Sequence, residues 1–223
     1  MWFAGPVRRV PEAGRPDALR LGFDLKPGMR VGLFGGSFNP AHEGHAHVAQ
    51  TARVRLGLDR VIWMVSPQNP LKTSAPESLA QRMAAARRFA RGPKMIVSDI
   101  ETRLGVRYTI DLIRILKARF PGVKFVWIMG ADSLASFHKW RGWSEILKSV
   151  PIAVISRPGS ELRGGLAPAA LRFGSARRPA AAAGRLTDRP PPAWIYLPAR
   201  LNHASSTTIR AGKASRRASE IPD

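Results

Sequence analysis

The sequence predicts an α/β fold, a Rossmann-like open parallel sheet with helices on both faces. Short, continuous apolar runs alternate along the chain with segments that have the apolar period of an amphipathic helix, as expected for parallel strands covered on both sides. The first run ends at Gly35 and Gly36, as a strand does where it enters a tight loop. The chain has 223 residues, of which 44% are hydrophobic, so it can bury the core of one such domain.

The domain is expected to occupy residues 29–212. Residues 1–28 carry prolines and scattered charges without a sustained period, and we predict a poorly ordered N-terminal extension without the apolar segment of a secretory signal. Residues 159–192 are rich in alanine, arginine, glycine and proline, which predicts a long irregular insertion with room for one short helix. Residues 213–223 form a short C-terminal tail.

Composition excludes several kinds of chemistry and location. The chain has no cysteine, so disulfides, thiolate catalysis and cysteine-ligated zinc are excluded. No stretch approaches about 18 uninterrupted apolar residues, so no membrane span is expected. The cytoplasm is the default location.

The formal net charge of +21 would attract polyphosphates of any kind, including nucleic acids. The excess is mostly arginine, and much of it lies in two apparently irregular segments, 163–189 and 200–217. The sequence shows neither a recognition helix nor the alternating aromatic and basic residues that bind single strands. We therefore do not predict a nucleic-acid partner.

The stretch 31–48 carries the strongest functional signal. Gly35 and Gly36 lack the Cβ atoms that would hold the backbone away from a ligand, and the helix after the loop offers free N–H groups to a phosphate. His42 and His45 stand three residues apart where that helix begins, so their rings should lie side by side. The stretch predicts a polyphosphate cradle with two imidazoles beside it. No third protein ligand is evident nearby, so we predict no metal site.

The next elements follow the same alternation. The first helix continues to about Gly57, and residues 61–65 form a second buried strand. Lys72 lies in the loop after that strand, at the carboxyl edge where open α/β sheets bind ligands. It is a candidate phosphate-binding cation; the alternative is a solvated loop lysine.

A helix is expected over 78–90, with apolar residues on one side and three arginines on the other: Arg82, Arg87 and Arg88. A third strand over 95–97 precedes an amphipathic helix that opens at Tyr108 and Thr109. Thr109 is well placed to cap that helix.

The fourth strand, 123–129, runs into Gly130 and then Asp132, repeating the order of the first turn. A carboxylate here would repel a triphosphate but suits a ribose hydroxyl. Alternatively Asp132 is the N-cap of the next helix, and the two roles are compatible. The fifth and sixth strands are expected over 151–155 and 194–197.

Consecutive hydroxyls follow the last predicted strand, at Ser205, Ser206 and Thr207. Before a helix they supply a cap and an anion-binding nest, and Arg210 lies one turn inside that helix. Taken alone, such a segment is usually only a cap.

These segments together resemble a known superfamily. GGSFNPAHEGH at 35–45 is similar to the (H/T)xGH signature of the nucleotidyltransferases, in the form found in bacterial nicotinate-nucleotide adenylyltransferases. SSTTIR at 205–210 resembles the superfamily's second signature, SSTxxR, which grips the β- and γ-phosphates of ATP. GADS at 130–133, followed by Trp140, resembles the segment that helps to enclose the nicotinate ring.

The resemblance implies sites for ATP and for nicotinate mononucleotide. The implied catalytic residues are His42, His45 and Arg210. The implied ATP contacts are Gly35, Gly36, Ser37, Phe38, Asp132, Ser206 and Thr207. The implied mononucleotide contacts are Lys72, Thr109 and Trp140. Magnesium would travel with the triphosphate, held largely by phosphates and water.

The chain departs from the family pattern at two places. Arg141 stands where many members have tyrosine, although a cation would suit a nicotinate carboxylate; Trp143 is an alternative ring-stacking residue. The tail beyond Arg210 is also short, so it is either reduced or truncated.

The implied reaction is direct in-line attack of a mononucleotide phosphate on the α-phosphorus of ATP, catalysed by positioning and charge stabilisation. Nicotinate mononucleotide is the leading acceptor. Nicotinamide mononucleotide and phosphopantetheine are alternatives, and a basic non-catalytic nucleic-acid-binding protein on the same scaffold is the rival from another class. The oligomeric state is left open.

Overall fold

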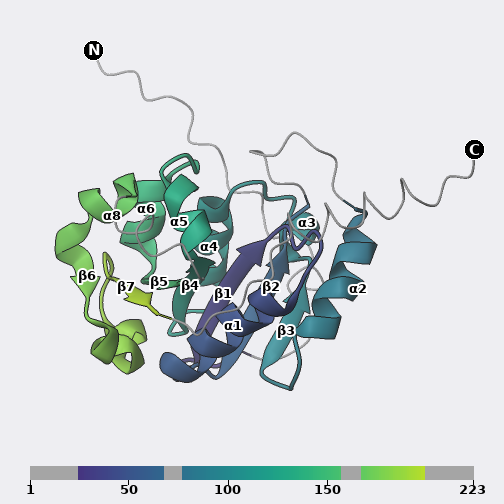
Figure 1. The fold of residues 1–223 in the computed structure, drawn as a ribbon, viewed down its shortest axis with the longest axis horizontal. Coiled ribbons are helices and arrows are strands. Elements are labelled where there is room, and N and C mark those ends of the chain that lie inside the picture. The colour runs from purple at the N-terminus through teal and green to yellow at the C-terminus, as the bar shows by residue number, and fades with distance from the viewer. Residues whose placement is uncertain (1–24, 68–76, 157–166, 199–223) are drawn as a thin grey trace, which may run out of the picture.

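The structure, a computed structural model, describes residues 25–67, 77–156 and 167–198. Within them, seven strands form one sheet in the order β3-β2-β1-β4-β5-β7-β6, and every neighbouring pair is parallel (Figure 1). The strands are β1 (Arg30–Gly36), β2 (Arg60–Val65), β3 (Met95–Ser98), β4 (Lys124–Gly130), β5 (Ile152–Ile155), β6 (Arg177–Arg178) and β7 (Trp194–Leu197). The predicted open parallel sheet is confirmed.

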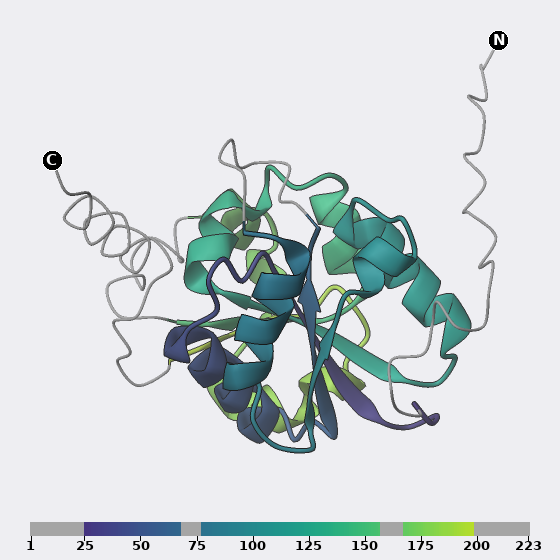
Figure 2. The ribbon, with the colours of Figure 1, turned by 90° about the vertical axis from the view of Figure 1, so that its right-hand side faces the viewer.

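Helices cover both faces of the sheet (Figures 1 and 2). One face carries α1 (Glu43–Arg55), α2 (Leu79–Phe89) and the 3-10 helix η3 (Ala180–Asp188). The other carries α3 (Ile100–Arg103), α4 (Thr109–Arg119), α5 (Ala131–Phe137), α6 (Trp143–Ser149), α8 (Pro168–Arg172) and the short 3-10 turn η2 (Gly174–Ala176). None of the helices in the described ranges is both long and apolar enough to span a bilayer.

Neighbouring residues of the central strands alternate between two apolar cores. Leu33 and Trp127 belong to the core beneath α4 and α5. Phe34 and Trp63 belong to the core beneath α1 and α2. All four are buried, which explains why the strands read as unbroken apolar runs in the sequence.

The segment that we expected to be an irregular insertion has defined structure from residue 167 onward. Besides the one short helix, α8, it forms η2, the two-residue strand β6 and η3. Ala183 and Leu186 of η3 are buried against the α1 face of the sheet. Because alanine is small and apolar, an alanine-rich helix can approach a sheet closely, so composition alone did not distinguish it from a linker.

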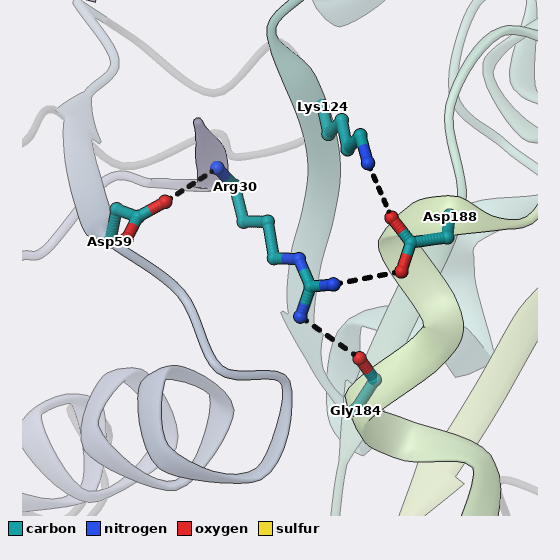
Figure 3. Close-up of polar contacts among 5 residues, drawn as sticks. All are labelled: Arg30, Asp59, Lys124, Gly184 and Asp188. Atoms are coloured by element: carbon teal, nitrogen blue, oxygen red, sulfur yellow. Dashed lines mark hydrogen bonds and ion pairs between the residues drawn. The ribbon is translucent and has the colours of Figure 1, made fainter. Parts of the chain in front are cut away.

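An ionic network holds the last turn of η3 against the amino ends of β1 and β4 (Figure 3). Asp188 accepts from Arg30 Nη2 at 2.8 Å and from Lys124 Nζ at 2.7 Å, and Arg30 Nη1 donates to the Gly184 carbonyl at 3.2 Å. The hydrogen bond from Lys124 is the main reason that the pKa of Asp188 is lowered; desolvation opposes it, and the charges of Arg30 and Lys124 lower the pKa further. This network lies at the edge of the sheet opposite the loops discussed below.

The strand order reverses between β1 and β4. The chain moves outward from β1 to β2 and β3, and then returns to β4 on the other side of β1. In open α/β sheets, ligands bind at such a switch point, outside the carboxyl ends of the strands. The turns after β1, β2 and β4 all lie at this edge.

Candidate functional site

Two histidine rings lie side by side where β1 passes into α1. His42 is the N-cap of α1, and its Nδ1 accepts from the Gly44 N–H at 3.1 Å. His45 Nδ1 accepts in turn from the His42 N–H at 3.3 Å, which completes a capping box. The ring centroids are 3.9 Å apart. The prediction that the two imidazoles lie over one spot is confirmed.

The capping box also fixes the tautomer of both rings. A ring nitrogen that accepts a hydrogen bond carries no hydrogen, so in the neutral form the hydrogen of each ring lies on Nε2. We expected the first N–H groups of α1 to serve a phosphate. In the structure the Gly44 N–H already donates to His42, so that amide supports the histidine instead. Each Nε2–H is therefore the imidazole donor suited to a phosphate oxygen.

Aromatic rings occupy the space beside both glycines of the turn. A Cβ on Gly35 would lie 2.6 Å from the indole of Trp127, and one on Gly36 would lie 3.1 Å from the ring of Phe38. The packing of the chain itself thus leaves no room for a side chain at Gly35, whereas one at Gly36 would require the Phe38 ring to shift by a few tenths of an ångström. The approach of ATP to the backbone of Gly35 and Gly36 stays a prediction.

Phe38 packs in the core on the α1 face of the sheet. Its ring is buried, stacks on Trp63 with centroids 5.2 Å apart, and meets His45 edge-on at 5.0 Å. Its φ of 44° is in the left-handed region, which is strained for a bulky residue and persists only where the surroundings impose it. Because its ring faces the core, Phe38 can serve a nucleotide only through its backbone.

Arg82 does not lie where the sequence placed it. We assigned it to the charged side of α2, but it is only 1% exposed. Its guanidinium donates to the carbonyls of Ser37 and Ser66, at 2.9 and 2.6 Å, so it contacts the turn after β1 and the end of β2. Burial lowers its pKa, and the nearby charge of Glu77 opposes that shift.

The turn after β4 stands beside the turn after β1. Gly130 is the N-cap of α5, and Asp132 lies in the first turn of that helix. The alternative that Asp132 caps α5 is therefore wrong. Asp132 is exposed at the switch point, which is where a dinucleotide fold places the acid that binds a ribose hydroxyl.

The start of α4 lies beside the turn between α5 and α6. The guanidinium of Arg141 lies over the Tyr108 ring at 4.5 Å from its centroid, and the space beside Gly142 is filled by Ile110, 3.3 Å from a built Cβ. Tyr108 is the N-cap of α4 and makes no side-chain cap bond, while Thr109 is the first helical residue. The prediction that Thr109 caps α4 is wrong, because the cap position falls one residue earlier.

Trp140 and Trp143 have different surroundings. Trp140 meets Trp127 edge-on, with centroids 6.1 Å apart, so it stands next to the indole that lies against Gly35. Trp143 packs between Phe137 and Phe173, at 6.1 and 5.7 Å. Trp140 is thus connected to the phosphate turn, whereas Trp143 belongs to the packing of α6 against α8.

Glu101 is a buried acid that the sequence reading did not single out. It lies in α3, directly after β3, and is 9% exposed. Burial raises its pKa to about 7. Its only sequence signal was an acid placed next to the apolar Ile100 at the end of a strand.

Four predicted site residues lie outside the described residues: Lys72, Ser206, Thr207 and Arg210. The expectation that the hydroxyl-rich turn meets the histidines across one ATP therefore stays a prediction. Across the part of the chain that the structure describes, no three acidic or histidine side chains gather as a metal-binding group.

Comparison with known proteins identifies the family. The model of the family described as cytidylyltransferase-like matches residues 33–212. A relative from Caulobacter sp. (strain K31), named "probable nicotinate-nucleotide adenylyltransferase", is 67% identical over 183 residues, which cover 82% of this chain and 97% of the relative. A relative of the same name from Cereibacter sphaeroides (strain ATCC 17023) is 50% identical over 183 residues, with the same coverage.

A solved structure has a similar fold. The solved structure of Plasmodium falciparum nicotinic acid mononucleotide adenylyltransferase, complexed with NaAD, superposes with a TM-score of 0.60 and covers 82% of this chain and 83% of that chain. The two sequences are 14% identical, so this likeness concerns the fold. The chain belongs to the cytidylyltransferase-like family of nucleotidyltransferases, among the nicotinate-nucleotide adenylyltransferases.

Proposed function

We propose that this chain transfers AMP from ATP to nicotinate mononucleotide, giving nicotinate adenine dinucleotide and pyrophosphate in NAD biosynthesis. Relatives at 67% and 50% identity, aligned over 82% of the chain, carry the corresponding name. The observation that carries the proposal is the pair of imidazoles at the switch point, 3.9 Å apart and held by a capping box. A cytoplasmic location stays a prediction.

The chemistry is a direct displacement at phosphorus. An oxygen of the acceptor's phosphate attacks the α-phosphorus of ATP, the bond from that phosphorus to the bridging oxygen breaks, and pyrophosphate leaves with the electron pair. The substrate is the magnesium complex of ATP, in which phosphates and water hold most of the metal's coordination sites. His42 and His45 act by donating from Nε2 to phosphate oxygens as charge moves onto the leaving group.

The acceptor ring is assigned to the side of Trp140. That indole adjoins Trp127 and thereby the turn at Gly35, while Trp143 is engaged by Phe173. Arg141, held over Tyr108, would place a cation close to the carboxylate that distinguishes nicotinate from nicotinamide.

The direct test is pyrophosphate release from magnesium ATP with a panel of acceptors. We expect the highest kcat/KM with nicotinate mononucleotide, a lower one with nicotinamide mononucleotide, and none with phosphopantetheine. Absence of release with every acceptor, together with salt-sensitive RNA binding, would refute the proposal in favour of a non-catalytic scaffold.

The role of His45 is tested by His45→Ala, with His47→Ala as a matched control from the same helix. We expect kcat to fall by about 100-fold or more in His45→Ala, because the lost contact strengthens in the transition state. The His47→Ala variant should keep its turnover. His45→Ala removes the hydrogen bond that His45 Nδ1 accepts from the His42 N–H, which costs about 1 kcal/mol, so circular dichroism should report a folded protein. A folded His45→Ala variant with near-normal turnover would remove His45 from the mechanism.

A further inference from the structure

One buried guanidinium connects three segments at the carboxyl edge of the sheet. Arg82 Nη1 donates to the Ser37 carbonyl at 2.9 Å and to the Ser66 carbonyl at 2.6 Å. Its Nη2 donates to the Pro67 carbonyl at 2.8 Å, and its Nε donates to the Glu77 carbonyl at 2.9 Å. With 1% of its surface exposed, Arg82 is among the largest fully buried side chains of the described residues.

The choice of arginine is informative because every acceptor is a backbone carbonyl. Burying a cation is costly unless its donors are bonded, and stability alone is often served as well by an apolar side chain of similar volume. A rigid planar fork with five N–H donors can fix several carbonyls in one geometry, whereas lysine has a single flexible point of donation. The arrangement therefore specifies the relative positions of two strand ends and α2.

The most consequential of these contacts is the one to Ser37. This carbonyl belongs to the peptide group that joins Ser37 to Phe38, whose φ of 44° needs external support. Because the peptide group is planar and trans, turning the Ser37 carbonyl toward Arg82 turns the Phe38 N–H away from it. The backbone of the same turn is held once more by the Ser66 N–H, which donates to the Gly36 carbonyl at 3.0 Å.

We propose that Arg82 is a positioning residue for adenylyl transfer: it holds the Ser37 carbonyl inward, so that the backbone of the turn after β1 presents an N–H rather than an oxygen to the phosphates of ATP. The inference depends on the proposed function for the identity of the reaction, whereas the contacts of Arg82 do not depend on it. Arg82 itself does not touch the reacting atoms. It acts through the turn that carries Ser37 and Phe38, and through the end of β2 that lies beside it.

The kinetic test compares Arg82→Lys with Arg87→Lys, which makes the same change on the exposed side of the same helix. We expect Arg82→Lys to lower kcat/KM for ATP by about 100-fold, as a misplacement of about 1 Å does in an active site. The KM for ATP should rise, because the turn that carries Ser37 would no longer be held. Arg87→Lys should match the wild type in both constants.

A second measurement needs no acceptor. Amide hydrogen exchange should become faster in Arg82→Lys at residues 36–39 and at Ser66, and stay unchanged in β4 and α4; Arg87→Lys should change neither. If the wild type proves inactive with nicotinate mononucleotide, the proposed function fails and the exchange experiment still decides the role of Arg82. The inference is overturned if Arg82→Lys and Arg87→Lys have the same kcat/KM for ATP. It is also overturned if exchange accelerates uniformly or if Arg82→Lys does not fold, because Arg82 would then be a determinant of the whole fold.

Discussion

Replacing Glu101 by glutamine should change how the stability of the protein depends on pH. Glu101 is 9% exposed, and burial raises its pKa from 4.5 to about 7. Between these two values the folded state binds more protons than the unfolded state. The free energy of unfolding therefore falls as the pH rises from about 4.5 to about 7, and this loss is complete above the folded pKa.

The size of the effect follows from the shift. At about 1.4 kcal/mol per tenfold change in proton affinity, the rise from 4.5 to about 7 corresponds to a loss of about 3 kcal/mol on going from acid to neutral pH. Glutamine is close to the protonated acid in shape and carries no charge. We expect Glu101→Gln to match the wild type near pH 4.5 and to exceed its stability by about 3 kcal/mol above pH 7.

Urea unfolding at a series of pH values from 4.5 to 8.5 measures this difference, with midpoints and slopes recorded at each pH. Glu43→Gln, at an exposed position of α1, is the matched control and should run parallel to the wild type. If the free energies of unfolding of Glu101→Gln and the wild type differ by a constant amount across this pH range, burial does not raise the pKa of the Glu101 carboxyl, and the reasoning is refuted.

Three further predictions concern packing and charge. Gly35→Ala should lower stability by about 1–3 kcal/mol in scanning calorimetry, because its Cβ would meet the Trp127 indole at 2.6 Å; an unchanged Tm would mean that the indole moves aside freely. Trp140→Ala should raise the KM for the acceptor while Trp143→Ala mainly lowers stability, and the opposite pattern in steady-state kinetics and thermal unfolding would exchange their roles. Asp188→Asn should cost about 1 kcal/mol at neutral pH, with the difference lost as the pH falls through the lowered pKa of the carboxyl; a difference that persists in strong acid would exclude the ion pairs as its cause.

Most of the sheet could be predicted because β1, β2, β4, β5 and β7 are largely buried and therefore appear as apolar runs; the exposed two-residue β6 gives no such signal. The histidine pair was also predictable, since spacing on a helix determines which rings meet. Its capping box was not expected. The Nδ1 atoms of His42 and His45 each accept a hydrogen bond from a backbone N–H, and these bonds depend on backbone angles that the spacing does not reveal.

Arg82 shows how residue type can hide a position. It lies three residues after Leu79 and four before Ala86, which puts it next to the buried side of α2. We grouped it with Arg87 and Arg88 because arginine is usually exposed. The carbonyls that compensate its charge come from loops distant in sequence, and no local pattern announces them.

The prediction for the alanine-rich region was wrong because its composition hid apolar residues that are buried. Its low complexity suggested a linker, but Leu186 and Ala183 give η3 an apolar side, and Asp188 finds two cations at the ends of strands far away in the chain. Such long-range pairing becomes visible only once the order of the strands is known.

Trp127 has a consequence for how the enzyme can be altered. Its indole lies against Gly35 and also meets Trp140, so the spaces beside these two residues cannot be redesigned independently. Enlarging the room for a bulkier pyridine by shortening residue 127 would at once permit a side chain at position 35. We expect these three positions to vary together wherever nature or a designer changes the acceptor.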